Sequence, residues 1–156
     1  MATAGTKNQG IRVYIGTKAT DASSDSYTQV KRVKLVGEFG AEGPVIDATA
    51  LEDATRQKLK GIPDSGDVEL SGNRVYSDDG QNDLADAAED TDDDPYNFRI
   101  EIPGAGSGGG TPDLRFSFKA MVTRFKNVTG GVDGLIEFGA TLAITGAITD
   151  ASIAAP

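Results

Sequence analysis

Residues 46–73 read IDATALEDATRQKLKGIPDSGDVELSGN, and two different periodicities meet within them. Thr49 followed by Glu52 three residues later has the spacing of a capping box, which is typical of a helix start. Gly61 supplies the usual residue just beyond a helix end. The first half of the stretch therefore predicts a helix at about residues 50–60, placed between runs that are typical of strands.

Strand-like patterns fill much of the remaining chain. Their apolar and polar residues alternate, which favours strands with one buried face. One of them places Val33, Leu35 and Phe39 on the same face. The ranges with this pattern are 11–17, 30–39, 67–76, 96–102, 114–125 and 135–147.

A further short helix is predicted for residues 79–89, where Leu84 and Ala87 form a short apolar stripe. The fold class expected is mainly β: a single-domain β-sandwich or barrel with a flanking α-helix and one further short helix. A length of 156 residues is enough for one such domain with its own core.

Residues 1–156 are therefore expected to form one domain. Residues 1–10 are interpreted as a mobile N-terminal arm and residues 149–156 as a flexible C-terminal tail. The glycine-rich run at 104–111 lacks the lysine and the following helix of a phosphate-binding loop, and is interpreted as a flexible connection.

Composition argues against most catalytic chemistry. The chain has no Cys and no His, which removes thiol nucleophiles, serine–histidine triads and most zinc sites. We expect no enzyme activity and no cofactor. No apolar run is long enough to span a membrane and no signal peptide is apparent, so we expect a protein that folds in the cytoplasm without membrane contact.

The net charge of −9 is concentrated in one segment. Residues 64–101 hold thirteen acidic residues and two arginines, and the remaining chain is close to neutral. An acidic chain repels nucleic acid phosphates, so tight DNA binding is not expected.

An acidic run within that segment contains Asp90, Asp92, Asp93 and Asp94. These carboxylates could bind calcium, but the glycine and the distal glutamate of an EF-hand loop are missing. A solvated acidic loop is the favoured interpretation.

Several predicted strands carry a second face of small or charged residues. Such a face either meets bulk solvent or lines a water-filled channel. The candidate channel-facing residues are Glu69, Ser71, Asn73, Lys119 and Glu137.

Three cations, Arg56, Lys58 and Lys60, crowd the end of the helix predicted at 50–60. They would stabilise the C-terminal end of a helix. They could also contact the acidic segment of a neighbouring copy, so we treat them as candidate inter-subunit residues.

The chain resembles the major tail tube proteins of long-tailed, siphovirus-type bacteriophages and related tailed viruses. Four stretches carry the resemblance: residues 46–53, the turn KGIPDSG at 60–66, the strand VELSGN at 68–73 and the strand GATLAITG at 139–146. The resemblance extends over roughly residues 28–148.

This resemblance implies a β-sandwich with a flanking helix and assembly of copies into hexameric rings, which stack into a tube. It implies tail-tip, tape-measure and tail-terminator proteins as partners, and double-stranded DNA that passes through without specific binding. It also implies a place in the virion tail after assembly in the host cytoplasm. The polar strand faces would then line the lumen.

Two alternatives remain open. The inner tube protein of a contractile system, such as type VI secretion or a bacteriocin tail, would share the fold. A calcium-dependent, adhesin-like β-sandwich would belong to a different class of protein.

Overall fold

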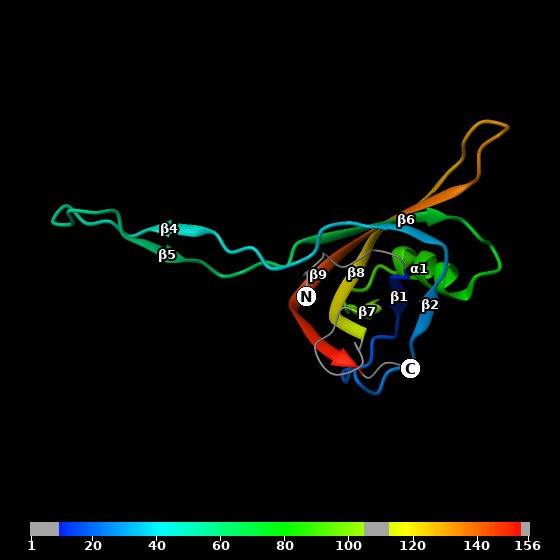
Figure 1. Cartoon of the computed structure of the whole chain (residues 1–156), viewed down its shortest axis with the longest axis horizontal. Coiled ribbons are helices and arrows are strands. Elements are labelled where there is room, and N and C mark those ends of the chain that lie inside the picture. The colour runs from blue at the N-terminus through cyan, green and yellow to red at the C-terminus, as the bar shows by residue number, and fades with distance from the viewer. Residues whose placement is uncertain (1–9, 105–112, 154–156) are drawn as a thin grey trace, which may run out of the picture.

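The computed structural model describes residues 10–104 and 113–153, and contains ten regular elements (Figure 1). The helix α1 and the strand β7 have the bounds that the sequence predicts. The strands are β1 (Arg12–Ile15), β2 (Thr28–Val30), β3 (Val33–Val36), β4 (Val45–Asp47), β5 (Lys58–Lys60), β6 (Asp67–Asn73), β7 (Tyr96–Ile102), β8 (Asp113–Val128) and β9 (Glu137–Ile153), and the helix is α1 (Asp79–Glu89).

Seven of these strands form one antiparallel sheet in the order β2-β1-β7-β8-β9-β6-β3. The sheet curls into a half-barrel around an apolar core, and α1 packs against the inside of the curl (Figure 1). Strands β4 and β5 form a separate two-stranded sheet. The fold is therefore mainly β with one helix, which confirms the predicted fold class.

The core is built from alternate residues of the long strands. Val68 and Leu70 of β6 are buried, as the alternation in the sequence predicts, and their neighbours Asp67 and Glu69 are exposed. The rings of Phe98 and Phe118 stack in the core at a centroid distance of 5.8 Å. Burial of such side chains stabilises each by about 1.5–3 kcal/mol.

Gln81 on α1 joins three parts of the chain from a fully buried position. Its Nε2 donates to the carbonyl oxygens of Lys31 at 2.8 Å and Asn73 at 2.9 Å. Its Oε1 accepts from the Val75 amide at 2.8 Å. This one side chain therefore connects the helix to the turn before β3 and to the end of β6.

The helix predicted for residues 50–60 is wrong. The segment is a hairpin loop that leads into β5, and Ile46 pairs with Leu59 across the hairpin. Thr49 donates from both its amide and its hydroxyl to Asp47 Oδ1, and the Ala50 amide donates to Asp53 Oδ2. Such local side-chain bonds compete with helix formation.

The face predicted for Leu35 is also wrong. The pairing of β3 with β6 shifts register between Val33 and Leu35, so a bulge interrupts the alternation. Leu35 is exposed, and Val33 and Val36 pack against the core instead. A bulge changes which face the following residues occupy.

Two of the expected chain ends are only partly described. Strand β9 continues to Ile153, so residues 149–153 belong to the sheet rather than to a flexible tail. Residues 154–156, most of the predicted N-terminal arm and most of the glycine-rich connection lie outside the described residues. Within the described ranges no helix is long and apolar enough to cross a membrane.

Replacing Gln81 with Met should destabilise the fold by several kcal/mol. Methionine keeps a similar length but leaves the carbonyls of Lys31 and Asn73 and the amide of Val75 without their partner. A buried polar group without a partner costs about 1–3 kcal/mol. Urea denaturation measures the change. Gln57→Met, an exposed position, is the matched control, and equal stability of the two variants would contradict the assigned role.

Candidate functional site

The first candidate surface is an arm, defined here as residues 43–62, that extends away from the half-barrel (Figure 1). Three residue pairs join β4 to β5. The Gly61 amide also donates to the Pro44 carbonyl at 2.6 Å, and the Ala48 amide donates to the Gln57 carbonyl at 2.9 Å. An isolated two-stranded hairpin is marginally stable in water. An isolated antiparallel bridge between Glu42 and Asp64 joins the two segments that lead into and out of the arm.

The arm leaves large apolar side chains in solvent. Ile46 and Leu59, which pair across the hairpin, are 51% and 59% exposed, and Leu51 near the tip is fully exposed. Apolar groups on both strands of a projecting hairpin have no core to contact in their own chain. Contiguous exposed apolar surface of this kind marks a site of protein–protein contact.

The three predicted inter-subunit cations all lie on this arm rather than on a helix. Arg56 Nη1 lies 3.3 Å from Asp47 Oδ2. Lys58 and Lys60 are exposed, and neither forms an ion pair with another described residue. The hydrogen bonds from Thr49 hold the pKa of Asp47 below its ordinary value, so Asp47 carries a charge for Arg56.

The second candidate surface is the polar face of β6 and β9. Four of the five predicted channel-facing residues lie there, on two neighbouring strands, because residues paired across antiparallel strands share a face. Asn73 pairs with Glu137, whose Oε1 accepts from Lys34 Nζ at 2.9 Å. Glu69 is exposed and Ser71 and Asn73 are half-buried.

Lys119, the fifth predicted residue, lies apart from the other four. It pairs with Thr145, whereas Glu69 pairs with Thr141, which comes earlier in β9. Its Nζ lies 3.3 Å from each of the carbonyl oxygens of Ala19 and Thr20. Lys119 therefore also holds the loop that follows β1.

The face that carries Lys119 holds two further cations that the alternation in the sequence does not place there. Arg124 pairs with Thr141, which also pairs with Glu69 on its other side, and Lys126 pairs with Gly139. The Arg124 guanidinium lies over Gly139, 3.0 Å from where a Cβ would stand. Strict alternation along β8 would place both cations on the opposite face, because it does not show the shift of register between Val122 and Arg124.

Lys18 forms ion pairs with two carboxylates of the acidic run. Lys18 Nζ lies 2.6 Å from Asp90 Oδ2 and 3.4 Å from Asp92 Oδ2. Tyr96 donates its hydroxyl to Asp90 at 2.9 Å. The described residues contain no cluster of three or more acidic, His or Cys side chains arranged to hold a metal ion. Lys18 therefore offsets the charge of the two carboxylates that it contacts.

Comparison with known proteins gives a fold and no family. No protein-family model and no curated protein sequence matches the chain. Solved structures do match over nearly the whole length at low sequence identity, which is evidence about the fold alone.

Three of these structures come from tubes or tails. A chain from the sheath/tube terminator of the extracellular contractile injection system PVC matches with a TM-score of 0.71 and 11% identity, over 97% of this chain and 100% of that one. A chain from the tail of an empty GTA particle matches with a TM-score of 0.70 and 14% identity, over 95% of this chain and 100% of that one. A chain of the SPP1 tail tube matches with a TM-score of 0.68 and 14% identity, over 97% of this chain and 81% of that one.

The half-barrel with one helix is thus a tail tube-like fold. The matched structures include both the SPP1 tail tube and a chain of a contractile injection system.

Replacing Lys18 with Gln should raise the pKa of Asp90. The Lys18 ammonium, the Asp92 amide and the Tyr96 hydroxyl lower the pKa of Asp90 from 3.8 to about 2. Because the folded-state pKa is depressed, the contribution of this carboxylate to stability is complete above about pH 4 and is lost as the pH falls through about 2. Carboxyl-carbon NMR titration measures the midpoint. Lys31→Gln is the control, and an unchanged midpoint in Lys18→Gln would contradict the assignment.

Proposed function

We propose that this chain is a virion structural protein whose copies assemble into stacked hexameric rings and form a tail tube that delivers genomic DNA. Assembly takes place in the host cytoplasm, and tail-tip, tape-measure and tail-terminator proteins are the expected partners. The tail tube-like fold supports the proposal. The GTA tail that the chain resembles was refined with C6 symmetry, which agrees with six copies in a ring.

The arm carries the proposal, because its apolar side chains contact no core of their own chain. Burial of Ile46 and Leu59 against another copy would stabilise the contact by about 1.5–3 kcal/mol for each side chain. An arm that extends out of the half-barrel reaches a copy in the next ring. The three cations on it, Arg56, Lys58 and Lys60, are available to acidic side chains of that copy.

The sheet edges support contacts within a ring. Strand β3 lies at one end of the sheet order and β2 at the other, so each lacks a partner on one side among the described strands. Exposed edges invite pairing with another chain, and closure of a barrel removes them. We propose that these edges join copies around the ring.

The polar face of β6 and β9 is proposed to line the lumen, with Glu69, Ser71, Asn73 and Glu137 on the side of passing DNA and Lys119 at its margin. A cation offsets a carboxylate on this face, since Glu69 of β6 and Arg124 of β8 both pair with Thr141 of β9 and share one cross-strand row. A wall in which opposite charges offset one another offers phosphates no continuous basic stripe to bind. DNA can then slide through without being held.

An inner tube of a contractile system is the second candidate function, and the match to the PVC sheath/tube terminator structure favours it. Such a tube works inside a sheath. Electron microscopy of particles that contain this protein distinguishes the two, because a second outer layer appears only in the contractile case.

The wild-type protein should form hollow stacked rings at high concentration, visible by negative-stain electron microscopy. The double variant Ile46→Ser/Leu59→Ser should lose them, because the arm then presents polar groups to the next ring. The melting temperature of the monomer should not change, since both side chains are exposed. A wild-type protein that stays monomeric up to millimolar concentration would contradict the proposal, and tubes of the variant would contradict the role of the arm.

Reversing one charge of the proposed lumen should make tubes retain DNA. Glu69→Lys places an added cation beside Arg124 in one cross-strand row. Co-sedimentation of a short labelled duplex with assembled tubes should increase, and salt should weaken it. Asp86→Lys changes the charge equally on the exposed face of α1 and is the control. Equal retention by the two variants would contradict the assignment of this face to the lumen.

A further inference from the structure

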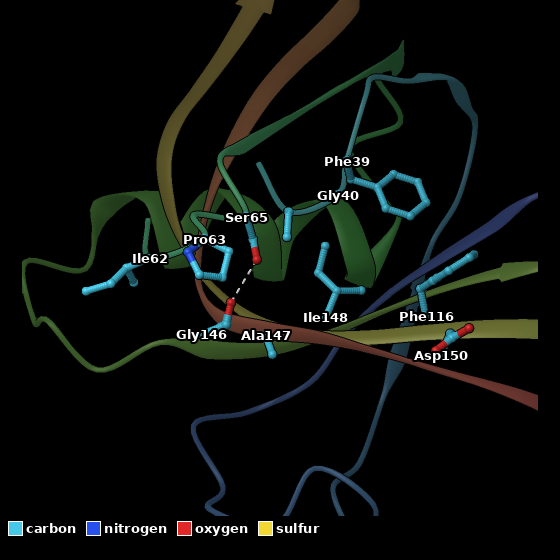
Figure 2. Close-up of a pocket in the computed structure, with 11 residues that line it drawn as sticks. Phe39, Gly40, Ile62, Pro63, Ser65, Phe116, Gly146, Ala147, Ile148 and Asp150 are labelled. Atoms are coloured by element: carbon cyan, nitrogen blue, oxygen red, sulfur yellow. Dashed lines mark hydrogen bonds between the residues drawn. The ribbon is translucent and has the colours of Figure 1, made fainter. Parts of the chain in front are cut away.

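An apolar groove lies at the base of the arm, between the start of β6 and the second half of β9 (Figure 2). Its volume is about 630 Å³. Phe39 and Phe116 pack edge to face with centroids 5.0 Å apart, and Ile148 and Pro63 line the same space. Pockets of this size hold several apolar groups.

The loop that joins β8 to β9 carries matching side chains. The Gly134 amide donates to the Gly131 carbonyl at 2.9 Å, which closes a turn with Val132 and Asp133 at its apex. Val132 is fully exposed and Leu135 is 70% exposed. Turn positions usually hold Gly, Asn, Asp or Pro, so a β-branched apolar residue at the apex is unusual.

The groove and the loop lie at opposite ends of the same strands. Ser65 Oγ donates to the Gly146 carbonyl at the groove end, and Asn73 pairs with Glu137 at the loop end. The seven residues of β6 between these two points span about 24 Å at the usual rise of a strand. Figure 1 shows the arm leaving one end of the half-barrel and the loop projecting from the other.

This placement favours a head-to-tail contact. A second copy displaced along the direction of β6 presents its loop to the groove of the first. The contact joins two different surfaces, so it repeats with every added copy and produces an open filament rather than a closed dimer.

Charge supports the same occupant. Asp133 at the apex of the loop has no ion-pair partner among the described residues, and the same is true of Lys60 near the base of the arm. Lys60 is two residues from Ile62, which also lines the groove. The groove is also lined by the carboxylate of Asp150, which would repel the carboxylate of a docked Asp133. Asp133 is therefore favoured on the side of the groove that faces the arm.

We propose that the loop of one copy inserts Val132 and Leu135 into the groove of the copy in the next ring, with Asp133 facing Lys60. This contact rests on the proposed tube and names the surfaces that join its rings. It adds to the contact that the arm makes, because the groove lies at the base of the arm and Ile62 and Lys60 belong to the arm.

Disulfide cross-linking tests the contact directly, because the chain contains no cysteine. The double variant Val132→Cys/Ala147→Cys, with both positions exposed, should give a ladder of covalent oligomers under oxidising conditions. The control Val132→Cys/Asp86→Cys, which moves the second cysteine to the exposed face of α1, should give at least tenfold less. A ladder no stronger than that of the control overturns the inference.

Electron microscopy of the same samples separates this inference from the proposed function. Tubes without the ladder overturn the loop-in-groove contact and leave the tube standing. A ladder in a protein that forms no rings or tubes supports the contact and counts against the tube.

A second variant needs no cross-link. Val132→Ser/Leu135→Ser should raise the concentration needed for assembly by about a hundredfold or more, because the two apolar side chains that are buried in the contact are replaced by polar ones. The melting temperature of the monomer should stay the same, because both side chains are exposed. An unchanged assembly threshold overturns the inference.

Discussion

The structure depends on the pairing of β8 with β9, the two longest strands. They pair from Asp113 with Ile153 to Val128 with Glu137, and every other strand of the large sheet is attached through them, β7 through β8 and β6 through β9. Two shifts of register interrupt the ladder. Bulges bend a strand and increase its twist, so the ladder curls and places its apolar face inside. Phe125 and Phe138, stacked at 5.7 Å, connect the two strands within that curl.

A curled sheet of this kind satisfies its interior and leaves its ends and edges open. The interior is filled by α1 and the core side chains, with Gln81 holding the helix in place. The apolar groups outside the core gather on the arm and on the loop between β8 and β9, at the two ends of the sheet. These exposed apolar groups and open strand edges lack partners within one copy, and contacts between neighbouring copies in a row could provide them.

The sequence was a good guide where one pattern acted alone. Strand β7 and helix α1 were predicted with their observed bounds, and the alternation of β6 identified Val68 and Leu70 as buried. A helix was wrongly predicted for the arm because many of its residues have high helix propensity, which tertiary context easily overrides. In addition, Thr49 and Asp53 form side-chain hydrogen bonds to the backbone, and such bonds occur in turns as readily as at helix starts. The β-branched pair Val45 and Ile46 and the alternation in residues 58–60 were the available signals for two paired strands.

Faces were misassigned where the pairing slips. Leu35 and Arg124 each follow a shift of register, and both lie on the face opposite to the one that strict alternation gives. The position of a bulge depends on the partner strand, which lies far away in the sequence. The charges of the candidate lumen could therefore be predicted only in part, with Glu69 and Glu137 found and Arg124 and Lys126 missed.

The shape of the arm has a kinetic consequence. If neighbouring copies order the arm, the first ring has to fix several arms at once, whereas each later copy meets a surface that is already formed. Starting a tube is then much slower than extending one, and free subunits can accumulate above the concentration at which growth is favourable. A pool of this kind assembles slowly on its own at high concentration and quickly once a template is supplied, so at lower concentrations the timing and the place of assembly pass to the template.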